Sequence, residues 1–244
     1  GRPACARGPP MTAPLLIVTG TGTGIGKTVV STGLVAAWGR RGLSVAGLKP
    51  IESGIDPAAA AAGDVGELGR VSTFHVTRFT PPYLLVDPVS PHLAARREGR
   101  EIDLRVIVDW VAPIRAAADA TVLELPGGLF SPLTDTLTNA NLLTALSPSK
   151  VVLVAPDRLG VIHDVLATTR AARAEGIAID GLLLSSVTEL DGSVGTNAAE
   201  LARVLPTVPV LGVLPRAPAA ALLPHLDAVL VALSLAQGTA APRT

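Results

Sequence analysis

The chain has little of the side-chain chemistry on which many catalytic and structural sites depend. Its one cysteine, Cys5, stands near the start, which excludes a disulfide framework, catalysis by a core thiol and a cysteine-rich zinc site. The four histidines form neither an HExxH nor an HxxxH pair. Any bound metal should therefore have oxygen ligands, and a reducing, cytoplasmic compartment is expected.

An excess of charge of either sign is also missing. The 20 Lys and Arg residues balance the 20 Asp and Glu residues, so the formal net charge is +0. Proteins that bind the phosphate backbone of nucleic acids need a basic surplus to displace counterions, so a nucleic-acid partner is not expected. Only three of the basic residues are lysines, namely Lys27, Lys49 and Lys150.

Long apolar runs are absent although 48% of the residues are hydrophobic. No stretch of about 18 uninterrupted apolar residues occurs, so no membrane span is predicted. The first ten residues, GRPACARGPP, lack the apolar centre of a signal peptide. They are predicted to form a disordered leader, followed by one domain over residues 11–244.

Short apolar runs alternate with helical patterns along the rest of the chain, which is typical of a doubly wound, mostly parallel sheet flanked by helices. Strands are expected at 15–19, 43–48, 121–125, 151–155, 181–185 and 208–213. Helices are expected at 28–41, 103–118, 137–146, 161–175 and 196–205. Pro57–Gly63 is predicted to be a mobile loop, and Phe79–Pro91 an irregular segment.

The sharpest motif is GTGTGIGKT, from Gly20 to Thr28, between the first strand and the first helix. Glycines let backbone N–H groups surround phosphate oxygens, Lys27 can reach the β and γ phosphates, and Thr28 can bind magnesium. The strict pattern places its first glycine where this chain has Thr21, one residue after Gly20. The motif nevertheless predicts a P-loop and an NTPase-like α/β domain.

Polar residues follow two other strands at the same predicted edge of the sheet. Lys49 and Ser53 lie in KPIESG, which follows the second strand, and Glu124 ends the third strand in the apolar run TVLEL. Burying Glu124 without a partner would be costly, so it should face an opening or another charge. With Thr28 and Asp64 it offers an oxygen set that suits magnesium, although Asp64 alone could be a helix N-cap.

In order along Leu15–Pro215, these residues resemble the dethiobiotin synthetase family of the P-loop NTPase superfamily. Besides the P-loop and KPIESG, the matching segments are GDVGELGR at 63–70, DPVSPHLAA at 87–95, the ExxGGL of 124–129, SPLTDTLT at 131–138, Leu159-Gly160 and VLGVLP at 210–215. The resemblance implies an ATP- and magnesium-dependent ligase of biotin biosynthesis. It would carboxylate 7,8-diaminononanoate with CO2 and close the ring through a carbamate and a carbamic-phosphoric anhydride.

The resemblance also implies residue roles and an assembly. Lys27 and Lys49 would be catalytic, and Thr28, Asp64 and Glu124 would bind the metal. Substrate would contact Ser53, Gly127, Gly128, Leu159 and Gly160. The nucleotide would contact Thr23, Gly24, Ile25, Gly26, Lys27, Thr28, Val29, Asp64, Glu124, Gly127, Ser185, Ser186, Pro215, Arg216 and Ala217. The family is homodimeric, so a homodimer is expected.

Three departures from the family pattern bear on these roles. Leu125-Pro126 replaces Gly-Ala after the glutamate, which removes one backbone donor. His163-Asp164 replaces Asn-His in the LGxINH loop, and Asp164 could repel a substrate carboxylate. Ser185-Ser186 replaces the Asn that reads adenine, so discrimination among nucleoside triphosphates is expected to be relaxed.

Other readings of the P-loop fit the sequence less well or stay open. A cobyrinate-type synthetase would need a glutaminase domain with a nucleophilic cysteine, and a GTPase would need N-K-x-D, which does not occur. A partitioning ATPase would carry a second lysine near the start of the loop. The alternative left open is a diverged P-loop paralogue with a different acceptor or a nucleotide-switch role.

Overall fold

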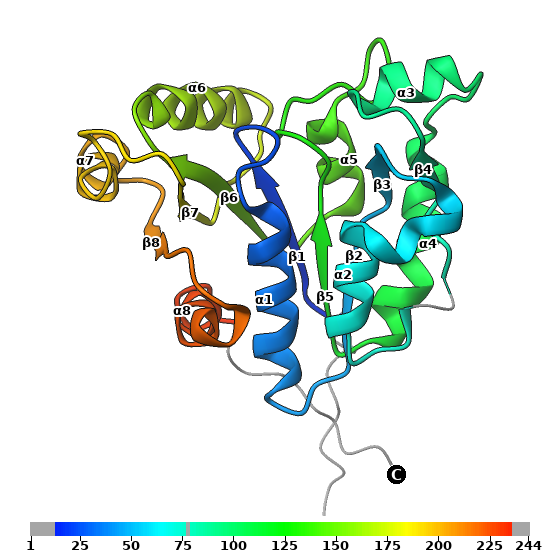
Figure 1. Ribbon diagram of the computed structural model, residues 1–244, viewed down its shortest axis with the longest axis horizontal. Helices are drawn as coiled ribbons and strands as arrows, with labels where there is room; N and C mark the ends of the chain where they lie inside the picture. The colour runs from blue at the N-terminus through cyan, green and yellow to red at the C-terminus, as the bar shows by residue number, and fades with distance from the viewer. Residues whose placement is uncertain (1–12, 77–78, 236–244) are drawn as a thin grey trace, which may run out of the picture.

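The computed structural model describes residues 13–76 and 79–235, so the predicted leader lies outside the described part. Six parallel strands form one sheet in the order β2-β5-β1-β6-β7-β8 (Figure 1). Their bounds are β1 Leu15–Gly20, β2 Val45–Leu48, β5 Ala120–Glu124, β6 Lys150–Asp157, β7 Gly181–Ser186 and β8 Val210–Leu214. The predicted doubly wound α/β fold is confirmed, and each of these strands overlaps the range expected from the sequence.

Helices cover both faces of this sheet, as continuous apolar strands require. On one face, Leu16 and Val18 of β1 pack with helices α1 (Lys27–Gly39) and α8 (Ala219–Ala232). On the other face, Leu15 and Ile17 pack with helices α4 (Leu104–Ala117), α5 (Asn139–Leu146) and α6 (Val161–Ala174). Helix α7 (Asn197–Val204) lies before the edge strand β8.

A second, two-stranded parallel sheet pairs β3 (Ile51–Ser53) with β4 (Tyr83–Leu85). The sequence patterns did not predict this sheet, nor helices α2 (Asp64–Val71) and α3 (Pro91–Arg97). The prediction of a loop at Pro57–Gly63 was wrong over Pro57–Ala62, which form the 3-10 helix η1; Asp56 caps it by accepting the Ala58 N–H. The predicted mobility of this segment stays a prediction. The prediction of an irregular segment at Phe79–Pro91 was wrong over β4.

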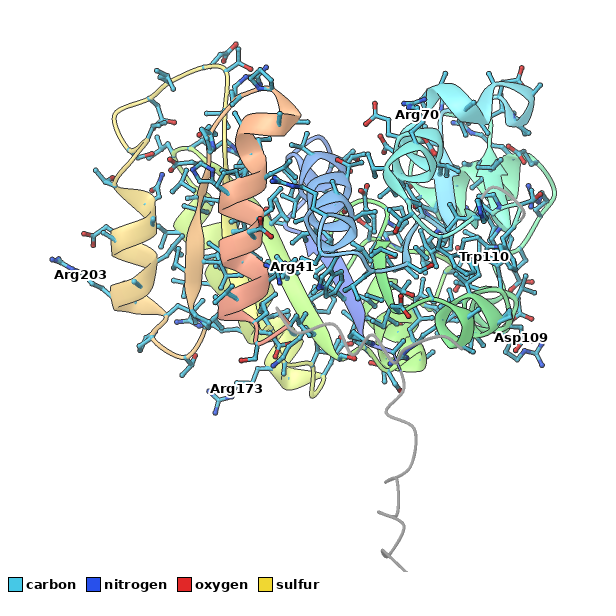
Figure 2. The ribbon with its side chains drawn as sticks, turned by 90° about the horizontal axis from the view of Figure 1, so that it is seen from below. Arg41, Arg70, Asp109, Trp110, Arg173 and Arg203 are labelled. Atoms are coloured by element: carbon cyan, nitrogen blue, oxygen red, sulfur yellow. The ribbon has the colours of Figure 1, made fainter. Side chains whose placement is uncertain are left out.

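The alanine- and leucine-rich helix α8 packs along α1. Leu226 of α8 fills the space beside Gly33, where a Cβ would lie 2.0 Å from its Cδ1. Arg41, which Figure 2 shows beside α8, donates to the Asp227 carboxylate at 2.9 Å. The indole of Trp38 donates to the carbonyl of Leu235 at 3.0 Å. Among residues 13–76 and 79–235, no helix has the length and hydropathy to cross a membrane.

Candidate functional site

The P-loop runs from the end of β1 into α1 at the carboxyl edge of the sheet. Gly26 is the N-cap of α1 with φ +90°, a left-handed conformation that favours glycine. Lys27 is only 6% exposed, and its Nζ donates to the carbonyl of Gly22 at 2.6 Å. Burial, aided by the charge of Lys49, outweighs the attraction of Glu124 and Asp64 and lowers the pKa of Lys27 to about 8. The lysine is therefore held inside the loop, where added negative charge would favour its protonated form.

Lys49 lies just beyond β2 and joins two carboxylates from different elements. Its Nζ donates to Oε1 of Glu124 at 2.9 Å and also hydrogen-bonds Asp64 Oδ2. The hydroxyl of Thr28 donates to the same Glu124 oxygen at 3.1 Å. Burial lowers the pKa of Lys49, but Glu124 and Asp64 together outweigh it and raise the pKa above its ordinary value. Lys49 is thus a permanent cation near neutral pH, in contact with both carboxylates.

The oxygen donors predicted to bind metal come together in this structure. Glu124 is 1% exposed, and its second oxygen, Oε2, has no hydrogen-bond partner within the described residues. Asp64 keeps a side chain that is 38% exposed. Two carboxylates and the Thr28 hydroxyl are hard oxygen donors of the kind that magnesium prefers, with positions left for phosphate and water. The prediction that Asp64 could be a helix N-cap was wrong, because Gly63 is the N-cap of α2 and Asp64 is its first residue.

Ser53 ends β3, and its buried hydroxyl has no partner in the described part of the chain. A buried hydroxyl without a partner is uncommon and fits a group that a ligand would satisfy. Its role toward substrate stays a prediction.

Of the two glycines after Glu124, Gly127 lies beside the Ser131 side chain and Gly128 packs against the backbone of the P-loop. A Cβ on Gly128 would lie 3.1 Å from the carbonyl oxygen of Gly20, and the Gly128 N–H already donates to the Ser131 hydroxyl at 2.8 Å. Asn139, fully buried, donates to the carbonyls of Pro126 and Gly128. The Leu125-Pro126 turn is therefore hydrogen-bonded to Asn139 of α5. Gly127 has φ +64°, and its contact with ligand stays a prediction.

The residues predicted to surround the base line one cavity of about 370 Å³ beside the P-loop. Ser185 and Ser186 end β7, and the Ser185 hydroxyl would lie 2.6 Å from a Cβ on Gly26. Arg216 donates to the Thr188 hydroxyl at 3.0 Å across the cavity mouth. The lining includes Gly24, Ile25, Gly26, Val29, Ser185, Ser186, Pro215, Arg216 and Ala217 of the predicted set. Thr23, exposed at the tip of the loop, is not among them.

Leu159 and Gly160, predicted to bind substrate, precede α6. Gly160 is the N-cap of α6, and the N–H of Leu159 donates to the Asp191 carboxylate at 2.8 Å. Asp164, which could repel an anion, pairs with Arg158 at 3.5 Å. The backbone N–H of Leu159 is therefore already bonded to a carboxylate of the chain, and the substrate contacts of Leu159 and Gly160 stay predictions.

The sequence reasoning missed Glu52 and Asn139. Glu52 is 7% exposed and accepts the N–H groups of Asp64 at 2.8 Å and Val65 at 2.9 Å. The signal available was an acidic residue between Ile51 and Ser53 in a segment where burial would be costly. Nothing local in the sequence indicated that Asn139 would support the Pro126 turn.

Comparisons with known proteins identify relatives along most of the chain. A family model described as an AAA domain matches residues 15–221. The ATP-dependent dethiobiotin synthetase BioD of Ralstonia nicotianae is 40% identical over 218 residues, 88% of this chain and 92% of that protein. BioD of Pseudomonas aeruginosa is 37% identical over 221 residues, 88% of this chain and 96% of that protein.

Solved structures support the fold. The MinC:MinD complex of Aquifex aeolicus matches with a TM-score of 0.56 at 13% identity, covering 95% of this chain and 99% of that one. MinD of Pyrococcus horikoshii matches with a TM-score of 0.54 at 20% identity, covering 93% and 95%. At these identities the likeness concerns the P-loop NTPase fold alone.

Proposed function

The chain belongs to the family of ATP-dependent dethiobiotin synthetases, enzymes of biotin biosynthesis. We propose that it catalyses the carboxylation and ring closure of 7,8-diaminononanoate at the edge of the sheet that carries the P-loop. One amine adds to CO2 and loses a proton to give a carbamate. A carbamate oxygen attacks the γ-phosphorus and ADP leaves. The second amine then attacks the carbonyl carbon, phosphate leaves, and the ureido ring closes.

The observation that carries this proposal is a hydrogen-bonded cluster next to the P-loop lysine. In it, Lys49 bonds both Glu124 and Asp64, and Thr28 bonds Glu124. Carbamate and triphosphate are both anions, so their approach requires fixed positive charge. Lys27 is placed to hold the phosphates, and Lys49 is placed to neutralise charge on the carbamate and on the phosphoryl group in transfer. A nucleophilic side chain is not required for any of the three steps.

Thr28, Asp64 and Glu124 are the residues proposed to hold magnesium. When bound, the ion would neutralise phosphate charge during transfer. The free Oε2 of Glu124 and the partly exposed Asp64 support this assignment. Ser53 would donate to the carbamate or accept from the diamine, since its hydroxyl lacks a partner within the described chain.

We propose that the base site accepts more than one nucleoside triphosphate. The ends of β7 and β8 offer hydroxyls and one guanidinium, from Ser185, Ser186, Thr188 and Arg216, around the cavity. A single hydroxyl cannot span the donor and acceptor pair of an adenine edge as a side-chain amide does.

A homodimer is likewise proposed from the family. Leu159, 72% exposed, and Leu190, 76% exposed, line the same cavity together with Arg158 and Asp191, and they offer apolar surface to a second copy of the chain. Sedimentation of the purified chain should give twice the monomer mass, and a monomer at working concentration would contradict the proposal.

The test of the reaction is release of phosphate by the purified protein with ATP, magnesium, bicarbonate and 7,8-diaminononanoate. Phosphate should appear only when the diamine is present, together with one dethiobiotin per phosphate. Phosphate release without diamine, or none at all, would favour the diverged paralogue or a nucleotide switch.

A further inference from the structure

The N-terminus of helix α2 is capped by the side chain of Glu52, which belongs to β3, and not by its own N-cap residue. The N-cap residue, Gly63, has no side chain, and the carboxylate of Glu52 accepts the first two N–H groups of the helix, those of Asp64 and Val65. A carboxylate at a helix N-terminus also interacts favourably with the helix dipole. These bonds reach from β3 over 12 and 13 residues of sequence.

Few buried side chains hold the start of α2, although Gly66 packs closely against the backbone of Ala61. The preceding η1 contains no buried residue, and Leu68 is the one buried residue of α2. Arg70 donates to the carbonyl of Ala61 at 2.8 Å, but that contact is exposed. The Asp64 carboxylate meets Lys49, so its position relative to the metal and phosphate site depends on where α2 begins.

The contact between Glu52 and the start of α2 requires a residue without a side chain at position 63. Its φ of −91° and ψ of −172° suit any residue, so the backbone does not require glycine there. A Cβ at this position would lie 2.3 Å from Oε1 of Glu52. The glycine therefore provides the space through which the carboxylate reaches the two N–H groups.

We propose that Glu52 is a positioning residue for the metal–nucleotide site, which holds Asp64 in register with Lys49 and Glu124 through the start of α2. The proposal rests on the proposed function for the identity of the metal as magnesium. Within the described residues, Glu52 forms no hydrogen bond or ion pair with the carboxylates or the lysine of the site, so its effect passes through the backbone of Asp64.

The experiment compares Glu52→Ala and Glu52→Gln with wild type. Calorimetry measures ADP binding with and without Mg2+, and turnover is measured across Mg2+ concentrations. Glu52→Ala should weaken the contribution of Mg2+ to ADP binding about 10-fold, the size of effect typical of groups that orient metal ligands. ADP binding without Mg2+ should stay within about 2-fold of wild type, because the P-loop contacts are intact. Glu52→Gln should recover part of the loss, since its amide oxygen can accept one of the two N–H groups.

Glu67→Ala is the matched control, because Glu67 is an exposed acid in the same first turn of α2. It should leave Mg2+-dependent ADP binding unchanged. An unchanged Mg2+ response in both Glu52 variants, measured below their thermal unfolding transitions, would overturn the proposal, as would an equal effect of Glu67→Ala.

A double-mutant cycle with Gly63→Ala separates positioning from general damage. Gly63→Ala should weaken Mg2+-dependent ADP binding in wild type and have little further effect in Glu52→Ala, because the clash is then gone. Additive effects would contradict the proposed contact. If the wild-type protein shows no diamine-dependent turnover, the proposed reaction is wrong. The measurements of ADP and Mg2+ binding would still decide the role of Glu52.

Discussion

The two halves of the nucleotide site are built in different ways. The phosphate half comprises the P-loop with Lys49, Asp64 and Glu124. Three of its charged groups are largely out of water, since Lys27 is 6%, Lys49 8% and Glu124 1% exposed, whereas the Asp64 side chain is 38% exposed. The base half comprises Ser185, Ser186 and Pro215–Ala217. Its serines are half-buried, and Pro215–Ala217 are exposed.

This difference in burial determines how each half responds to substitution. Removing one member of a buried ion pair leaves an uncompensated charge, which costs about 3–5 kcal/mol, so the residues of the phosphate half depend on one another. A hydroxyl at the edge of an open cavity has no such dependence, because water can replace its partners. Substitutions in the base half should therefore alter selectivity more than stability, and those in the phosphate half should alter both.

The largest expected effect is that of Lys49→Met in the phosphate half. It removes the cation that contacts both Glu124 and Asp64, and kcat should fall about 10²- to 10³-fold, as for loss of a preorganised charge-stabilising donor. The midpoint of thermal unfolding should also fall, since Glu124 loses its buried partner. Turnover and thermal unfolding are measured on the same preparations.

Lys150→Met is the control for this substitution. Lys150 is the remaining lysine, begins β6 and pairs with Asp180 at 2.9 Å. Its loss should leave kcat within about 2-fold of wild type, because Lys150 lies at the amino end of β6, away from the carboxyl edge of the sheet that carries the site. Comparable kcat for Lys49→Met and wild type would refute the role given to Lys49.

A smaller effect concerns the protonation of Lys27. Its pKa is lowered to about 8, chiefly by burial, so at pH 8 about half of the free protein carries a neutral lysine. Bound triphosphate favours the ammonium, so nucleotide binding at pH 8 should take up about half a proton, and affinity should fall as the pH rises through that range. Calorimetry of ATP-analogue binding in buffers with different ionisation enthalpies measures the uptake.

Uptake should nearly vanish at pH 6.5, because Lys27 is then protonated before nucleotide binds. It should also be absent at pH 8 in Lys27→Arg, whose guanidinium stays charged. Equal uptake in Lys27→Arg and wild type would assign the proton to another group.

Sequence patterns predicted the residues of the phosphate half, but not the β3–β4 pair and the Glu52 cap that lie beside them. The P-loop is contiguous, and strands that end at one edge of a parallel sheet bring Lys49 and Glu124 together whatever the intervening chain does. The β3–β4 pair could not be predicted in this way, because it joins Ile51 to Tyr83 across η1 and α2 and each strand has three residues. The cap that Glu52 places on α2 depends on that pairing, and so does the position of Asp64.

The base half had the weakest signal for the same physical reason. Ser185 and Arg216 come from strands that are adjacent only after β7 pairs with β8, where the register shifts between Leu182 and Leu183. Hydroxyls carry no charge that burial would make costly, so their roles cannot be argued from the sequence as that of Glu124 can. They were predicted from the resemblance to the family alone.

The smallest expected effect is that of Ser185→Asn in this half. An asparagine amide can both donate to and accept from an adenine edge, so kcat/KM for ATP should rise relative to CTP and GTP by about 10-fold, the equivalent of one to two hydrogen bonds. Competition among the triphosphates in the phosphate-release assay measures the ratio. Ser186→Asn also changes a residue of the cavity lining, but successive side chains of a strand point to opposite faces, so it should change the ratio much less. If wild type already turns over ATP alone, or if both asparagine variants behave alike, the base half discriminates by shape and not by the hydroxyl at 185.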